Sequence, residues 1–148
     1  MIDSRSLQIL QEVLRREERS VLQYVGDAFP WTTADRTEAL DRLQGIIHEE
    51  RDALARLGQF LYRNHAVPPA PSSYPASFTT LNFVSLDLIL KRLIPFQEQS
   101  LAAVEADLRS VTDPEARRQL ETFRDLKARH LEALRSLEGA AREPMVTS

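Results

Sequence analysis

The chain contains no cysteine, which excludes disulfide bonds, thiolate-held zinc, iron–sulfur clusters and cysteine catalysis. Only 4 of its 148 residues are glycine, so few positions weaken a helix from within. No apolar run approaches the roughly 18 residues of a membrane span, and residues 1–6 lack the apolar stretch of a signal peptide. We therefore expect a cytoplasmic protein that does not enter a membrane.

An excess of positive charge is also missing. The formal net charge is -3 at pH 7, and the sequence pI is about 5.7. Without a basic surface, binding to nucleic acid or to anionic lipid is not expected. The sequence contains no glycine-rich phosphate loop, no His-Glu-x-x-His zinc motif and no Gly-x-Ser-x-Gly nucleophile motif. These absences favour a protein that is not an enzyme.

Helical periodicity is what the sequence does contain. Apolar residues recur at three- and four-residue spacing in four stretches, which predicts an all-α protein without useful strand patterns. A chain of this length fits one domain, residues 1–148, with a flexible tail at 140–148. The four helices are expected at about residues 3–27, 33–64, 79–110 and 112–139.

The connection between the second and third helices is long and rich in proline. Residues 65–78 contain four prolines among serines and alanines, a composition that cannot form a helix. About 14 extended residues reach up to ~48 Å, comparable with the ~45 Å of a ~30-residue helix. The segment is therefore long enough to cross a whole bundle, which predicts parallel second and third helices. A loose surface loop is the competing interpretation.

Each predicted helix also places a polar residue near its middle, where the apolar spacing requires a core side chain. A buried charge costs several kcal/mol or more unless it is neutralised. The pattern therefore predicts either a metal site or an internal ion network. The residues concerned are Glu17, Tyr24, Glu50, Gln97, Lys127 and His130.

A less specific interpretation remains open for the two glutamates. Glu18 lies beside Glu17, and Glu49 lies beside Glu50, so a slight rotation of either helix would place the pair in water. His130 on its own would be compatible with an ordinary core histidine.

Four helices, one long crossover and ionisable groups at mid-core resemble the ferritin-like superfamily, bacterioferritin and rubrerythrin relatives in particular. Glu17 stands seven residues before Tyr24 in Glu-Glu-Arg-Ser-Val-Leu-Gln-Tyr, similar to the first ligand helix of that family. Glu50-Arg-Asp-Ala53, continuing to Pro68, looks like the second ligand helix. The resemblance implies a ferritin-like four-helix bundle with a di-metal centre of glutamates and Glu-x-x-His pairs.

Two positions depart from that family pattern. Ala53 stands where the resemblance implies a histidine, and Lys127 stands where it implies a bridging glutamate, three residues before His130. A lysine would repel a metal ion, but its ammonium could neutralise Glu17 and Glu50 instead. The sequence thus predicts a degenerate di-iron site that has become a metal-free ion network.

Two functions follow from these interpretations. The first is a non-catalytic interaction or assembly module, expected to be a homodimer without a cofactor. Tyr74, Phe78, Phe83 and Phe96 gather around the crossover and would either pack it onto the bundle or form the dimer interface. The alternative is an oxidoreductase or iron-handling protein that binds iron or manganese through an incomplete site. Its candidate ligands are Glu17, Glu50, Glu98 and His130.

Overall fold

The computed structural model describes residues 2–70 and 72–142, with side chains up to residue 140. Within these residues, the chain forms five α-helices, two 3-10 helices and no β-strand, which confirms the all-α prediction. The α-helices are α1 (Ser4–Glu18), α2 (Val21–Val25), α3 (Thr37–Arg63), α4 (Leu86–Leu108) and α5 (Pro114–Arg142). The 3-10 helices are η1 (Ala34–Arg36) and η2 (Ala76–Leu81).

The first predicted helix is broken into α1 and α2. The break lies at Arg19 and Ser20, and Ser20 has extended backbone angles (φ -70°, ψ 159°). The Ser20 hydroxyl accepts a hydrogen bond from the Gln23 amide at 3.2 Å, which satisfies a donor that the start of a helix leaves free. The expectation of one continuous helix to residue 27 was therefore wrong, because Ser20 caps a second helix.

The beginning of α4 also differs from the prediction. The sequence predicted a helix from residue 79, but that region forms η2, and Phe83 then adopts a left-handed conformation (φ 58°). Helix α4 starts only at Leu86, where the Ser85 hydroxyl accepts from the Leu88 amide at 3.2 Å. The helix boundary is thus set by the Ser85 cap.

The last helix begins as predicted and ends later. The Asp113 carboxylate accepts hydrogen bonds from the amides of Glu115 (3.0 Å) and Ala116 (2.9 Å). Pro114 has no amide hydrogen to satisfy at the first helical position. Helix α5 continues to Arg142, so the predicted tail begins in a helix, and residues 143–148 of that tail lie outside the described residues.

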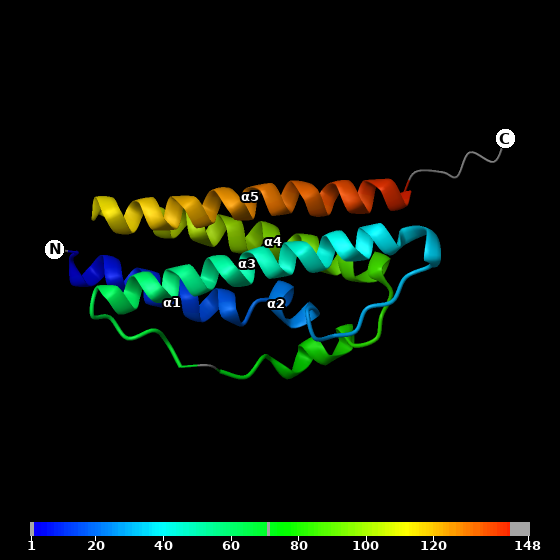
Figure 1. Cartoon of the computed structure of the whole chain (residues 1–148), viewed down its shortest axis with the longest axis horizontal. Coiled ribbons are helices and arrows are strands. Elements are labelled where there is room, and N and C mark those ends of the chain that lie inside the picture. Colours follow the sequence, from blue (N-terminus) through cyan, green and yellow to red (C-terminus); the bar gives the residue numbers. More distant parts are fainter. Residues whose placement is uncertain (1, 71, 143–148) are drawn as a thin grey trace.

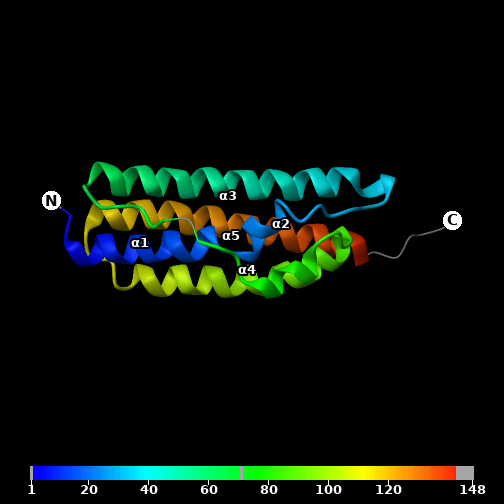
Figure 2. The same ribbon diagram turned by 90° about the horizontal axis from the view of Figure 1, so that it is seen from below.

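The long helices lie side by side along one direction (Figures 1 and 2). Helix α1, followed by α2, contacts α3, α4 and α5, and α5 also contacts α3 and α4. In Figure 1, α3 and α4 both run from the right of the view to the left, and the segment between them crosses the length of the molecule. This segment, residues 64–85, therefore connects opposite ends of the fold.

Aromatic side chains attach the crossover to the helices. Tyr24 on α2 packs edge-on against Tyr74 and Phe78, with ring centroids 5.2 and 5.6 Å apart. Phe78 in turn contacts Phe96 of α4 at 6.4 Å. These rings pack the crossover onto the fold, whereas Phe83 remains 69% exposed.

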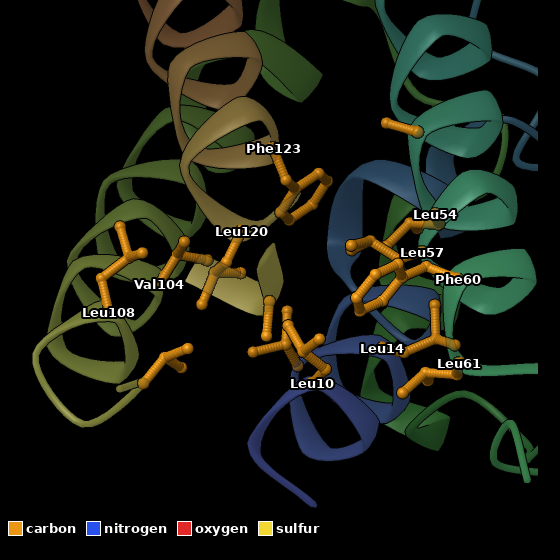
Figure 3. Close-up of a cluster of buried hydrophobic side chains, with 14 residues drawn as sticks. Leu10, Leu14, Leu54, Leu57, Phe60, Leu61, Val104, Leu108, Leu120 and Phe123 are labelled. Carbon is orange, nitrogen blue, oxygen red and sulfur yellow. The ribbon is translucent and has the colours of Figure 1, made fainter. Parts of the chain in front are cut away.

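The buried apolar side chains form two clusters, one toward each end of the molecule. The first apolar cluster (Figure 3) contains Leu10, Val13, Leu14, Ala53, Leu54, Leu57, Phe60, Leu61, Val104, Leu108, Val111, Ala116, Leu120 and Phe123. The second contains Val21, Leu22, Val25, Leu43, Ile46, Ile47, Leu81, Leu86, Ile89, Leu90, Leu93, Ile94, Leu131 and Leu134. On α3, α4 and α5, and at the end of α1, the predicted polar residues lie in sequence between the two clusters.

Candidate functional site

The site is a layer of polar side chains between the two apolar clusters. Glu17 on α1, Glu50 on α3, Gln97 on α4, and Lys127 and His130 on α5 are each at most 2% exposed. Each occupies a position that the helix turns toward the core, with apolar residues one turn before and after it. The helices therefore deliver charged groups to one water-poor region.

Lys127 lies at the centre of this layer. Its ammonium nitrogen Nζ is 2.6 Å from Glu50 Oε1 and 2.9 Å from Glu17 Oε1. It also donates to Gln97 Oε1 at 3.2 Å. Three acceptors match the three hydrogens of an ammonium group. The Phe123 ring, with its centroid 5.6 Å from Nζ, adds a favourable cation–π contact.

His130 is held between two carboxylates. Its Nδ1 lies 2.8 Å from Glu50 Oε2, and its Nε2 lies 2.7 Å from Glu49 Oε2. A neutral imidazole has one donor nitrogen and one acceptor nitrogen, so both contacts are hydrogen bonds only in the doubly protonated ring. The two buried bases, Lys127 and His130, thus contact the two buried carboxylates of Glu17 and Glu50, and His130 also contacts the half-exposed Glu49.

The network extends to the surface through Glu17. Its Oε1 also accepts a hydrogen bond from the Ser100 hydroxyl, and its Oε2 lies 3.2 Å from Nε of Arg16. Arg16 in turn pairs with Asp107, at 3.0 Å between Nη1 and Oδ2. At the other side, Glu49 is half exposed and links His130 to solvent. The buried charges are thus continuous with paired charges at the rim.

The carboxyl of Glu50 is stabilised in its ionised form. Burial raises the pKa of Glu50. The hydrogen bond from His130, together with the charge and hydrogen bond of Lys127, lowers that pKa by more than burial raises it. The net result is a pKa below the ordinary range for glutamate. For Glu49, the hydrogen bond from His130 is the largest influence and also lowers the pKa. Both carboxylates are therefore held ionised as partners of the bases.

Two residues proposed from the sequence do not join this layer. The Tyr24 side chain is only partly buried, and its hydroxyl donates to Asn82 Oδ1 at 2.5 Å. The break at Ser20 ends the helical register that would have placed Tyr24 one turn beyond Val21 on the core-facing line. Glu98 lies on the surface, 3.2 Å from Nη2 of Arg135, because Gln97 takes the inward position on α4.

The metal ligands of the alternative interpretation are consequently not assembled as a set. Glu98 is exposed, and Lys127 lies between Glu17 and Glu50. Across residues 2–70 and 72–140, no group of three or more histidine, aspartate or glutamate side chains is arranged to hold a metal ion.

Sequence reasoning missed three polar groups. Ser100 stands three residues after Gln97, a spacing that places both on one side of a helix and would have indicated it. Glu49 was considered only as the neighbour that a helix rotation would place in water together with Glu50, whereas His130 contacts both. Gln23 is 4% exposed. Its side-chain Nε2 donates to the Ile47 carbonyl, and its Oε1 accepts from Nε of Arg51. No periodic signal distinguishes Gln23, because α2 is only one turn long.

Every buried side-chain nitrogen and oxygen in the described part of the chain has a hydrogen-bond partner. The layer therefore neutralises carboxylates from separate helices without leaving a buried group unpaired.

Comparison of the chain with models of protein families, with curated proteins and with solved structures gives no match. No helix among the described residues has the length and apolar character to cross a membrane.

Proposed function

We propose that this chain is a ferritin-like four-helix module that acts in interaction or assembly rather than catalysis, with an internal ion network in place of a di-metal centre. Helices α1 and α2 together would form the first of the four rods. The common direction of α3 and α4, and the crossover between them, support this assignment.

The observation that carries the proposal is the position of the Lys127 ammonium. It contacts carboxylates from two other helices and an amide from a third. A cation that belongs to the chain is present whenever the chain folds, so the carboxylates need no metal supply. Because each partner lies on a different helix, the contacts also fix how the helices are aligned along their axes.

An exposed aromatic surface supports a role in assembly. Phe29 and Phe83 are 70% and 69% exposed, and their rings stack with centroids 5.8 Å apart. Trp31, two residues after Phe29 in sequence, is 56% exposed. Monomeric proteins rarely display contiguous large apolar patches, whereas aromatic residues are enriched where proteins bind one another.

The backbone holds these rings in place at a conformational cost. Phe29 and Phe83 have φ angles of 53° and 58°, a region that costs a bulky residue about 1–3 kcal/mol. The Phe83 amide donates to the Ala28 carbonyl at 2.8 Å, and the Trp31 amide donates to the Val84 carbonyl at 3.2 Å. Two distant loops are thus bonded together beneath the rings. We assign this aromatic surface to contact with a second copy of the chain.

Metal content tests the ion-network part of the proposal. The protein would be purified from cells supplemented with iron and manganese, and metal per chain would be measured by elemental analysis. We expect far less than one metal ion per chain, together with full helicity. Stoichiometric metal that is lost in Glu50→Ala and His130→Ala would instead support the oxidoreductase or iron-handling alternative.

Light scattering tests the assembly part. We expect the parent chain to be a dimer and the double variant Phe29→Ser, Phe83→Ser to be a monomer with unchanged helicity. Tyr62→Ser is the matched control, because Tyr62 is an exposed aromatic on α3 away from this surface. A monomeric parent, or a double variant that stays dimeric, would contradict the assignment. A large oligomer would indicate storage-cage assembly instead.

A further inference from the structure

A pocket of about 350 Å³ opens beside the ion network. Its walls come from the end of α1, the break before α2, η2 and the middle of α4. Glu17 and Gln97 line it and are at most 2% exposed, so its inner end reaches the network itself. Small-molecule sites have volumes of about 300–1,000 Å³ and a few convergent polar groups. This pocket falls at the small end of that range.

The pocket exists because of the helix break that the sequence did not predict. If the helix continued through Arg19 and Ser20, its side chains would occupy the space that the pocket takes. Instead, Ser20 turns the chain at the network, and both residues of the break line the opening. Phe78 of η2 and Phe96 of α4, which pack edge-on with ring centroids 6.4 Å apart, also line the pocket.

The charges at the pocket favour an anion. Arg16 and Arg19 lie at its outer rim, where Arg16 is already paired with Glu17 and Asp107. Arg19 donates through Nε to the Ser73 carbonyl at 2.9 Å, and no carboxylate of residues 2–70 and 72–140 forms an ion pair with it. Behind Glu17, the Lys127 ammonium neutralises that carboxylate. A fixed guanidinium charge therefore faces the opening without an anionic partner.

We propose that this pocket binds a small aromatic carboxylic acid. The carboxylate would pair with the Arg19 guanidinium, whose planar fork suits bidentate binding of carboxylates. The ring would pack against Phe78 and Phe96, and a hydroxyl at its far end would reach the Ser100 and Gln97 side chains. This inference goes beyond the proposed function, because an assembly module requires no small ligand.

Isothermal titration calorimetry of the full chain with benzoate, phenylacetate and 4-hydroxyphenylacetate tests the proposal. We expect saturable binding of one acid per chain, and at least tenfold weaker binding of tyramine, which replaces the carboxylate with an ammonium group. A charge-assisted hydrogen bond is strong enough to give about a tenfold change in affinity. No saturable binding of any of the three acids would overturn the proposal.

Two variants locate the binding. Arg19→Gln should weaken binding of the acid about tenfold or more, whereas Arg118→Gln, at an exposed arginine on α5, should leave it unchanged. Ala103→Leu places a larger side chain in the pocket wall and should abolish binding while the Tm is retained. Equal affinities in Arg19→Gln, Arg118→Gln and the parent would overturn the assignment. Because metal content and oligomeric state are separate measurements, failure here leaves the proposed function testable on its own.

Discussion

The first apolar cluster and the ion network are built by the same helices, one to two turns apart, yet they hold the fold together in different ways. In the cluster of Figure 3, side chains such as Leu10 and Phe60 make many non-directional contacts. In the network, Lys127 has three named acceptors, and each lies on a different helix. The cluster supplies stability that is insensitive to small shifts, whereas the network specifies one alignment of the helices.

Removing the central cation should have the largest effect. In Lys127→Ala, Glu17 and Glu50 lose their shared partner and remain as buried charges, so we expect a loss of about 3–5 kcal/mol in the free energy of unfolding. Urea unfolding followed by circular dichroism measures this change. A variant as stable as the parent would show that the carboxylates do not depend on Lys127.

A truncation in the apolar cluster should cost slightly less and should act independently. Leu10 is fully buried, and Leu10→Ala removes apolar contacts and leaves a cavity at a cost of about 3 kcal/mol. Combined with Lys127→Ala, its effect should add to within about 0.5 kcal/mol, because Leu10 is not among the acceptors of Lys127, which are Glu17, Glu50 and Gln97, and sites that do not interact directly are additive. Strong non-additivity of this pair would indicate that the cluster and the network are one cooperative unit.

Acid should weaken the network before it affects the apolar cluster. The pKa of Glu50 is lower in the folded state than in the unfolded chain, so the unfolded chain takes up a proton first as the pH falls. The stabilisation is therefore present in full above the unfolded pKa and is lost as the pH falls through the folded pKa. Unfolding measured between pH 7 and pH 3 should show a smaller loss in Glu50→Gln than in the parent. Identical pH profiles would contradict the assignment of this loss to Glu50.

The smallest effect is expected at Glu98. Its pair with Arg135 lies on the surface, with both side chains nearly half exposed, and such pairs contribute about 0–1 kcal/mol. Glu98→Ala should therefore change the free energy of unfolding by no more than about 1 kcal/mol. The helicity should stay the same. A large loss of stability would mean that Glu98 contributes to the core after all.

The sequence predicted the network where the helices are regular. Glu17, Glu50, Gln97 and Lys127 occupy core positions of uninterrupted helical periodicity, so spacing alone was enough to place them inward. Tyr24 was misplaced because the apolar spacing of the sequence continues through Ser20, whereas the helix itself is interrupted there. A serine can cap a helix or lie within one, and only the packing of the folded chain decides between them.

The crossover illustrates the same limit. The prolines of residues 65–78 indicated an extended segment, but the start of α4 at Leu86 was missed. Phe83 is held in a left-handed conformation by its bond to the Ala28 carbonyl, a residue distant in sequence. Local propensity carries no information about such a bond, so a non-glycine residue with positive φ escaped prediction. The pocket near Arg19 was missed for a related reason, since it depends on the break in the first helix.

A double-mutant cycle on Glu50 and Lys127 tests the central claim most directly. The free energy of unfolding would be measured for the parent, Glu50→Gln, Lys127→Met and the double variant. If Lys127 is the countercharge of Glu50, the double variant should be about 2–3 kcal/mol more stable than the sum of the single losses implies, because neither charge is then left unpaired. Additivity within about 0.5 kcal/mol would show that the two charges do not interact, and would contradict the account.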